Sequence, residues 1–494
     1  MTPIKNNTFL SKSLFLRGLQ CHKSLYLHKF HPELKDETSE PQESLYQSGT
    51  DVGVYARQLF PCGVEVPFEG MSIPEQIERT SVEIKNGANT IYEASFNHDD
   101  VFVKVDILHK DKDGWGIYEV KSSTSVKDVH INDAAVQYYT ATGAGLNISK
   151  VAVVHINNQY VKDGEIAVNE LFTVSDITET VREMQGFVND ELGKMREMLN
   201  CDTPQIDIGE HCSDPYDCDF HGHCWSHVPE DSVFSIRGRG VDRFDLYRQG
   251  IVRLKDVPLT MLSGKQRIQV EAALTKKNIF NRDGVKEFFN TLRYPLYFFD
   301  FETFMSPIPL FDGTRPYQQI PFQYSLFCQE KEGAELLHHE YLAQPKTDPR
   351  EELIKKLLDE IPEGACVMAY NKTFEIMVLR SLSAWFPEYA ERIEAIIANM
   401  VDLMVPFKNM DVYHYEMNGS YSIKAVLPVL VPELTYEGME VGDGGMAMDA
   451  YARMCRSEDL EEVKQIRKAL LEYCKLDTLA MVRILEKLKT TEAV

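Results

Sequence analysis

The stretch Leu296–Thr303, with the sequence LYFFDFET, decides the fold of the C-terminal half of the chain. Four aromatic residues within five positions predict a buried strand. Because successive side chains of a strand alternate between its faces, Asp300 and Glu302 project from the same face. Two carboxylates on a buried strand are unfavourable unless cations lie between them, and a pair of divalent ions is a common solution. Such ion pairs cleave phosphodiester bonds. The stretch therefore predicts a metal-dependent phosphodiesterase; the alternative is an amphipathic strand with two solvated acids.

The length and composition are those of a soluble globular protein. With 494 residues, 44% hydrophobic and 26% charged, the chain has room for two or three domains. No apolar run is long enough to span a membrane. Arg17 interrupts the apolar segment Leu14–Leu16 and no small-residue cleavage site follows, so we expect neither a signal peptide nor membrane association. We therefore expect a cytoplasmic protein, whose ten cysteines are free thiols or metal ligands rather than disulfides.

Charge is distributed unevenly along the chain. The formal net charge of −24 argues against a general nucleic-acid coat protein, because phosphate binding depends on cations. From Asp231 to Arg293, however, 13 Lys and Arg stand against 7 Asp and Glu, so this segment carries +6 and the remainder −30. We predict that 231–293 is a basic helical connector and a candidate nucleic-acid track. A solvated helical face is the alternative.

A second group of candidate catalytic residues falls in the N-terminal half. We expect strands at 91–96, 101–108 and 115–121 and a helix over 132–143; they carry Glu93, Asp106, Glu119, Lys121 and Gln137. The side chains of Glu119 and Lys121 share one strand face. In a metal-dependent nuclease the acids hold Mg²⁺ or Mn²⁺ and the lysine activates water or stabilises phosphate charge. A Glu–Lys pair alone is common on strands, so the prediction depends on the whole combination.

This combination resembles the PD-(D/E)XK nucleases of the RecB type, including the iron–sulfur exonucleases of CRISPR adaptation. The resemblance implies Glu93, Asp106 and Glu119 as metal ligands and Lys121 and Gln137 as catalytic residues. The sequence departs from the Gln-x-x-x-Tyr motif of that family, because an alanine occupies the tyrosine position. The nearest substitutes are two tyrosines in the same helix, Tyr138 and Tyr139.

Three cysteines recur at six-residue steps after this region. The segment 211–224 is rich in Gly, Pro and Asp, which favours metal ligands over core residues; it contains Cys212, Cys218 and Cys224. RecB-like iron–sulfur nucleases have one cysteine before the nuclease core and three after it. That resemblance implies a 4Fe–4S cluster with Cys21 as the fourth ligand. The alternative is a local tetrahedral Zn²⁺ site completed by His211, His221 and His223.

Two further acids follow the Leu296–Thr303 strand in the expected C-terminal domain. An apolar strand at 367–371 runs into a helix that begins near Glu375. A helical acid near an N-terminus is also favoured by the helix dipole alone, which is the alternative for Glu375. The last helix, expected over 460–488, carries Tyr473 and Asp477 four residues apart and therefore on one face.

These motifs resemble the DnaQ-like exonucleases of the RNase H-like fold, in the branch whose third motif is Tyr-x-x-x-Asp. The resemblance covers residues 294–488. It implies that Tyr473 orients the attacking water and that two Mg²⁺ ions are held by Asp300, Glu302, Glu375 and Asp477. The family usually has Asp where this chain has Glu375, whose side chain is one methylene longer.

The order of both halves also resembles a bacterial family of uncharacterised proteins that fuse a RecB-like nuclease to a DnaQ-like exonuclease. We expect an α/β protein with a PD-(D/E)XK nuclease domain over 1–230 closed by the cysteine cluster, a connector over 231–293, and an RNase H-like exonuclease domain over 294–494. The predicted function is hydrolysis of DNA, with RNA as the second candidate, at two separate metal sites. The alternative is a nucleic-acid-binding or scaffold protein in which one or both sites no longer cut.

Overall fold

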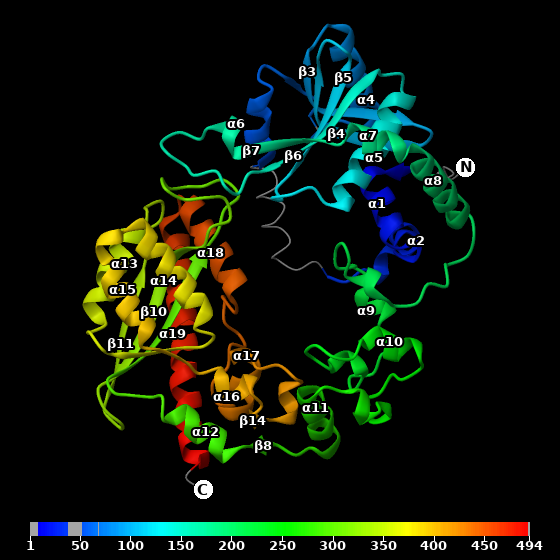
Figure 1. Ribbon diagram of the computed structural model, residues 1–494. Helices are drawn as coiled ribbons and strands as arrows, with labels where there is room; N and C mark the ends of the chain where they lie inside the picture. Colours follow the sequence, from blue (N-terminus) through cyan, green and yellow to red (C-terminus); the bar gives the residue numbers. More distant parts are fainter. Residues whose placement is uncertain (1–7, 38–51, 68, 493–494) are drawn as a thin grey trace. The chain divides into compact units, whose positions relative to one another are not determined.

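The computed structural model describes residues 8–37, 52–67 and 69–492 (Figure 1). The chain is of the mixed α/β class, as predicted, and divides into two compact units. Unit 1 comprises Met1–His227 together with Ser306–Tyr317, and unit 2 comprises Val228–Met305 and Gln318–Val494. The predicted connector, 231–293, lies within unit 2.

Unit 1 is built on a mixed sheet of seven strands in the order β2-β3-β4-β5-β6-β7, with β1 paired to β4. The predicted strands at 91–96, 101–108 and 115–121 are confirmed. The bounds are β1 Leu10–Ser11, β2 Val64–Glu65, β3 Thr90–His98, β4 Val101–Lys110, β5 Trp115–Lys121, β6 Ile148–Ile156 and β7 Phe172–Asp176. The helices are α1 Lys12–Gln20, α2 His22–Phe30, α4 Ile73–Lys85, α5 Asp128–Gly143, α6 Val168–Leu171, α7 Thr178–Glu183, α8 Gln185–Leu199 and α9 His221–Cys224.

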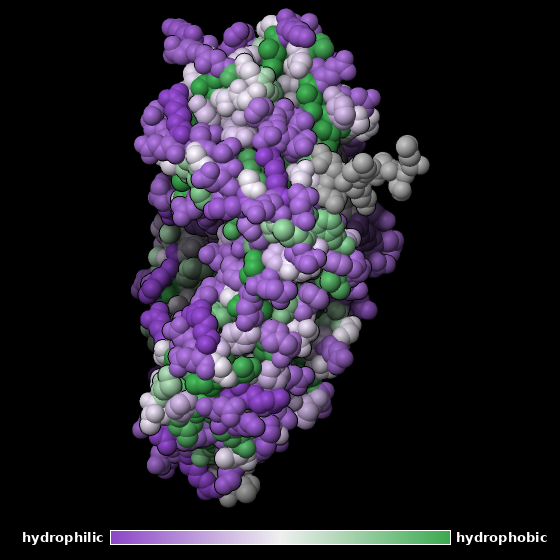
Figure 2. All heavy atoms as spheres, turned by 90° about the vertical axis from the view of Figure 1, so that its right-hand side faces the viewer, coloured by the Kyte–Doolittle hydropathy of each residue, from purple (hydrophilic) through white to green (hydrophobic). Residues whose placement is uncertain are grey.

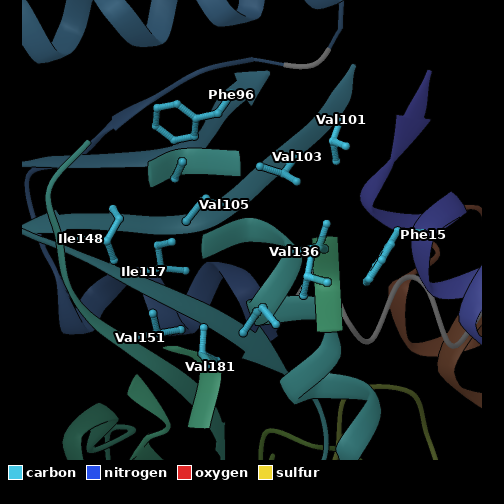
Figure 3. Close-up of a cluster of buried hydrophobic side chains, with 14 of the residues drawn as sticks. Phe15, Phe96, Val101, Val103, Val105, Ile117, Val136, Ile148, Val151 and Val181 are labelled. Atoms are coloured by element: carbon cyan, nitrogen blue, oxygen red, sulfur yellow. The ribbon is translucent and has the colours of Figure 1, made fainter. Parts of the chain in front are cut away.

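Apolar side chains cover both faces of this sheet. On one face, residues of β4 and β5 pack with Phe15 of α1 and Val136 of α5 in one buried cluster (Figure 3). On the other face Tyr92, Ile107 and Tyr118 pack with Ile308. Ile308 belongs to the segment 306–317, whose Tyr317 hydroxyl donates a hydrogen bond to the backbone carbonyl of Ser122. That segment therefore completes the core of unit 1, although in sequence it lies between two strands of unit 2.

Unit 2 is built on a five-stranded sheet in the order β11-β10-β9-β12-β13. An antiparallel meander of β9, β10 and β11 is extended by β12 and β13, which run parallel to β9. The bounds are β9 Leu296–Phe304, β10 Ile320–Gln329, β11 Leu336–Leu342, β12 Cys366–Ala369 and β13 Met400–Asp402. A separate two-stranded sheet consists of β8 Ile279–Phe280 and β14 Val412–Tyr413. The helices are α10 Arg243–Arg248, α11 Gly264–Thr275, α12 Arg282–Phe289, α13 Arg350–Glu360, α14 Thr373–Trp385, α15 Ala390–Ala398, α16 Val405–Lys408, α17 Ile423–Leu430, α18 Gly444–Arg456 and α19 Leu460–Glu492.

One local element bears directly on the cysteine site. Between Lys12 and Phe30 the structure shows two helices, α1 and α2, separated by Cys21. Cys21 has an extended backbone (φ −162°, ψ 117°), which breaks the helix and turns its thiol away from the helical repeat.

One face of the molecule can be judged for polarity. Hydrophilic residues dominate the face shown in Figure 2, and hydrophobic residues are scattered over it in small groups. Among the helices of the described ranges, none has both the length and the apolarity needed to cross a membrane.

Candidate functional site

The acids of β9 in unit 2 are placed by strand geometry. Asp300 and Glu302 lie on the same face of β9, as predicted from the alternation of side chains. Their neighbours on β10 are Ser325, opposite Asp300, and Gln323, opposite Glu302. This face of the sheet therefore carries polar side chains on two adjacent central strands, which requires an equally polar partner above it.

Helix α19 supplies that partner. The side-chain amide of Gln323 donates to the backbone carbonyl of Leu470 (2.8 Å), and the hydroxyls of Ser325 and Thr478 share a hydrogen bond of 2.6 Å. These three side chains are buried. The two contacts flank Tyr473 and Asp477 along the helix and hold that helical face against β9. As a result Asp300 and Glu302 approach Cys474 so closely that their ligand atoms lie within 4.8 Å of one another.

Glu375 reaches the site from helix α14. Strand β12 ends at Ala369, and Asn371 then adopts a left-handed backbone (φ +69°) with its N–H donating to Asp402 Oδ1 (2.9 Å). Helix α14 begins two residues later, which places Glu375 in its first turn. Glu375 is only 2% exposed, and its Oε2 atom has no hydrogen-bond partner among the described residues. A buried carboxylate oxygen without a partner is what a bound cation would satisfy.

The four predicted acids line one open pocket of 440 Å³ together with Tyr473, so the structure brings all five residues together. Burial and the nearby Asp477 raise the pKa of Asp300 and that of Glu302 well above their usual range. Burial, followed by the charge of Asp402, raises the pKa of Glu375 to about 8. The charge of Lys424 acts in the opposite direction and lowers the pKa of Glu302 and that of Asp477. One lysine cannot balance four carboxylates, so the site binds either protons or added cations.

Two tyrosines adjoin the fourth acid. Burial raises the pKa of Asp477, while hydrogen bonds from the hydroxyls of Tyr436 and Tyr473 lower it. Burial and the charge of Asp477 raise the pKa of both tyrosines far above its usual value, so both hydroxyls remain protonated donors. Tyr436 is absent from the sequence prediction because it lies in an irregular segment between α17 and α18, with no periodicity to indicate its direction.

These raised pKa values give a stability prediction. An acid with a raised folded-state pKa is still protonated in the folded protein at a pH where the unfolded chain has ionised. Its stabilising contribution is complete below the unfolded pKa of about 4 and is lost as the pH rises toward the folded value, about 8 for Glu375. In EDTA we therefore expect the unfolding temperature to fall from pH 5 to pH 8. Added Mg²⁺ or Mn²⁺ should raise it more at pH 8 than at pH 5.

The matched control for this measurement is the double variant Asp300→Asn/Glu302→Gln, which keeps the shape of both side chains and removes two charges. In EDTA at pH 8 it should unfold at a higher temperature than the wild type, and it should lose most of the metal response. Equal metal responses of the two proteins in scanning calorimetry would contradict a metal site at these carboxylates.

In unit 1, the predicted residues of β5 and α5 form a tight polar cluster around Glu119, which is 1% exposed. The ammonium groups of Lys121 and Lys12 lie 2.6 and 2.9 Å from Glu119 Oε1, and the amide of Gln137 donates to Oε2 (2.6 Å). Asp133 completes the cluster, at 2.6 Å from Lys121 and 3.2 Å from Lys12. The sequence prediction includes Glu119, Lys121 and Gln137 but lacks Lys12 and Asp133.

Asp106 and Glu93 lie at the margin of this cluster. Asp106 Oδ2 accepts a hydrogen bond from the N–H of Val120 (2.7 Å), and burial together with the charge of Glu119 raises its pKa to about 7. Glu93 influences Asp106 through its charge, but its carboxylate pairs with Arg57 (3.4 Å) and Lys104 (3.2 Å). The two tyrosines considered for the family motif have other partners: Tyr138 contacts Arg182 and Tyr139 donates to Asp99.

The electrostatic balance of this cluster differs from that of unit 2. Burial raises the pKa of Glu119, but Lys12 and Lys121 outweigh it and hold that pKa well below its usual range. In return the acids outweigh the burial of Lys121 and raise its pKa. Two lysines therefore pair with Glu119 and Asp133, although burial and the charge of Glu119 still raise the pKa of Asp133, whereas the acids of unit 2 have one lysine for four carboxylates.

The four predicted cluster cysteines converge in unit 1. Cys21, Cys212, Cys218 and Cys224 line one small cavity, and the four thiols are close enough for their charges to influence one another. Hydrogen bonds hold the α1–α2 junction against the cysteine loop: the amide of Gln20 donates to the carbonyls of His211 (2.9 Å) and Tyr216 (2.6 Å).

A single zinc ion needs closely spaced ligand atoms. A tetrahedral zinc ion with Zn–S bonds of about 2.3 Å holds its sulfurs about 3.8 Å apart. Among the described residues the only three ligand atoms found within 4.8 Å of one another are those of Asp300, Glu302 and Cys474, so no three cysteine sulfurs approach that closely. His211 and His221 line the same cavity, and His221 stacks on Trp225 with ring centroids 4.6 Å apart. His223 is not part of the lining.

Comparisons with known proteins find similarity over part of the chain. Residues 297–422, which include Asp300, Glu302 and Glu375, match the family described as "Domain of unknown function (DUF2779)". The chain is 28% identical over 255 residues to "Uncharacterized protein MG366 homolog" of Mycoplasma pneumoniae, which covers 48% of this chain and 38% of that protein. It is 27% identical over 236 residues to "Uncharacterized protein UU173" of Ureaplasma parvum, which covers 42% of this chain and 34% of that protein. The chain thus matches little more than a third of the length of these relatives, and it is similar to them over less than half of its own.

Proposed function

We propose that unit 2 is a metal-dependent phosphodiesterase that acts as a DnaQ-like exonuclease of the RNase H-like fold. One observation carries the proposal: Asp300, Glu302, Glu375 and Asp477 meet at one pocket in which Lys424 is the cation that offsets their charge. The unpartnered Oε2 of Glu375 supports divalent cations, Mg²⁺ or Mn²⁺, as the missing partners.

The roles of the residues follow from their chemistry. The four carboxylates would hold the ions, which when bound polarise the phosphate and lower the pKa of water. Tyr473 keeps its proton and can donate to or orient the attacking water, because its hydroxyl lies at the same pocket. Tyr436 fixes the orientation of the Asp477 carboxylate through its hydrogen bond. The open mouth of the pocket gives a strand end access to these groups.

For unit 1 we propose a second nuclease site of the PD-(D/E)XK type. Glu93, Asp106 and Glu119 would hold the metal, Lys121 would stabilise charge on the phosphate, and Gln137 holds Glu119 in place. The short contacts among Glu119, Lys121 and Gln137 support this assignment. The position of Lys12 favours the alternative function, a nucleic-acid guide or scaffold. From helix α1 this lysine pairs with Glu119, one of the three proposed metal ligands, and with Asp133, and so offsets part of the acidic charge without metal, as a nucleic-acid guide or scaffold requires.

For the cysteine cavity we propose a 4Fe–4S cluster held by Cys21, Cys212, Cys218 and Cys224, in a protein that resides in the reducing cytoplasm. The four cysteines line one cavity, and no three of their sulfurs lie within 4.8 Å of one another, which supports a cluster larger than a single ion. All ten cysteines of the chain are free, so no disulfide competes for these thiols.

The test of the function is metal-dependent cleavage of end-labelled DNA and RNA by the full chain and by one variant of each site. Asp300→Ala and Lys121→Ala should remove different components of the product pattern, and the combined variant should be inert. If the wild type cleaves neither the DNA nor the RNA with Mg²⁺ or Mn²⁺, the proposal that this protein is an enzyme fails. If Lys121→Ala leaves every product unchanged, unit 1 is the guide or scaffold.

A further inference from the structure

A second, larger pocket of unit 2 adjoins the carboxylate pocket. It has a volume of 970 Å³ and shares Tyr370, Asn371 and Ile423 with the wall of the carboxylate pocket, so the two pockets are neighbours. Five of its lining residues are cations, and none of the described residues that line it is an acid. We call it the basic groove, and its cations are Arg237, Arg239, Arg243, Lys265 and Lys408.

The cations of the basic groove are available for a ligand. All five side chains are exposed, and none of them lies within 4.0 Å of a carboxylate in the part of the chain that the structure describes. Lys265 donates to the backbone carbonyl of Lys408 (2.6 Å), and Arg237 donates to that of Asn418 (3.2 Å). In a chain of net charge −24, five cations without a carboxylate partner around one acid-free groove favour a polyanionic ligand.

Buried glutamines fix the loop that carries two of these arginines. Gln269 accepts a hydrogen bond from the N–H of Arg237 (3.0 Å) and donates to its carbonyl (3.2 Å). Gln266 accepts from the N–H of Val241 (3.3 Å) and donates to the carbonyl of Gly238 (3.4 Å). Both glutamines belong to α11 and are at most 6% exposed. The loop is therefore held in one conformation while its arginine side chains have no carboxylate partner among the described residues, as in a preformed binding surface.

We infer that the basic groove binds the sugar–phosphate backbone of a single nucleic-acid strand whose end lies at the carboxylates of β9, an inference that rests on the proposed exonuclease function. Four of the five cations come from the segment 231–293, so the groove gives that basic segment a defined role. The exposed ring of Tyr421 also lines the groove and offers a base a surface for stacking. The carboxylates then act on the terminal phosphodiester while the groove holds the following phosphates.

The experiment compares two double variants of the full chain that remove the same charge. Arg239→Ala/Arg243→Ala removes two cations of the groove. The control, Arg282→Ala/Arg456→Ala, removes two exposed arginines of unit 2 that line neither pocket. Binding of a labelled single-stranded oligonucleotide is measured in EDTA by fluorescence anisotropy at several salt concentrations. Hydrolysis of a nitrophenyl ester of a mononucleotide is measured with Mg²⁺ or Mn²⁺.

We expect the groove variant to bind the strand at least about tenfold more weakly, with a slope of log affinity against log salt smaller by about 1.4, because each lost phosphate contact contributes about 0.7. The control should bind like the wild type, and both variants should hydrolyse the small ester normally. Equal binding by the two variants would overturn the groove assignment. Loss of ester hydrolysis in the groove variant alone would also overturn it, because the residues would then belong to the carboxylate pocket.

The two proposals can fail separately. A wild type that hydrolyses neither strand nor ester, but whose strand binding still depends on Arg239 and Arg243, refutes the exonuclease and supports the groove. A wild type that cleaves the strand, but whose strand binding does not depend on Arg239 and Arg243, supports the exonuclease and refutes the groove. Competition by inorganic phosphate at concentrations that leave control DNA binders unaffected would show a small-anion site and overturn strand binding.

Discussion

Asp477→Asn is expected to slow strand cleavage by unit 2 about a thousandfold, because it removes one of four charges that would hold the metal ions. The substitution preserves the size of the side chain and its ability to accept the hydrogen bond from Tyr436, so the packing of α19 on β10 should remain. The rate is measured with end-labelled strand at saturating metal, in the Lys121→Ala background so that unit 1 does not contribute.

Two tyrosine variants act as matched controls for Asp477→Asn. Tyr473→Phe and Tyr436→Phe each remove one hydroxyl that donates to the Asp477 carboxylate. If Tyr473 orients water, Tyr473→Phe lowers the cleavage rate roughly ten- to a thousandfold even at saturating metal. Tyr436→Phe should instead weaken metal binding, because its hydroxyl orients a ligand. A fully active Tyr473→Phe beside an inactive Asp477→Asn would refute the water-orienting role and leave the metal site standing.

The four acids and Tyr473 of the unit 2 site were predictable because each lies in a regular element whose period fixes the direction of its side chains. Alternation on β9 places Asp300 beside Glu302, and the i, i+4 spacing on α19 places Tyr473 beside Asp477. Asp133 and Gln137 on α5 have the same i, i+4 spacing. The position of Asp133 beside Gln137 could therefore also have been predicted from the sequence.

The remaining residues had no such local signal. Lys12 reaches Glu119 across 107 residues of sequence, and a lysine on an exposed-looking helix gives no indication of a buried partner that far away. The segment 306–317 is a turn between β9 and β10 in sequence, yet its apolar residues Ile308 and Tyr317 complete the core of unit 1. Which unit a loop packs against is decided by tertiary contacts, and single-sequence periodicity does not contain them.

Cys21→Ala is expected to remove nearly all protein-bound iron, which should amount to about four irons per chain in anaerobically purified wild type. The cluster would join the α1–α2 junction to the loop that carries Cys212, and so close a long segment of chain. Loss of that closure should lower the unfolding temperature of unit 1 by on the order of 10 °C, because the unfolded chain regains the entropy of the open loop.

The control for Cys21→Ala is Cys201→Ala, which removes an exposed thiol that does not line the cysteine cavity and should leave iron content and colour unchanged. Metal analysis and the visible absorption of the cluster provide readouts independent of nuclease activity. Stoichiometric zinc with little iron, unaffected by Cys21→Ala, would contradict the cluster and indicate a local zinc loop. In that case Cys21 is only a packing residue, and the hydrogen bonds of Gln20 to His211 and Tyr216 hold the junction without metal. The iron content of Cys21→Ala therefore decides whether metal or protein contacts close unit 1.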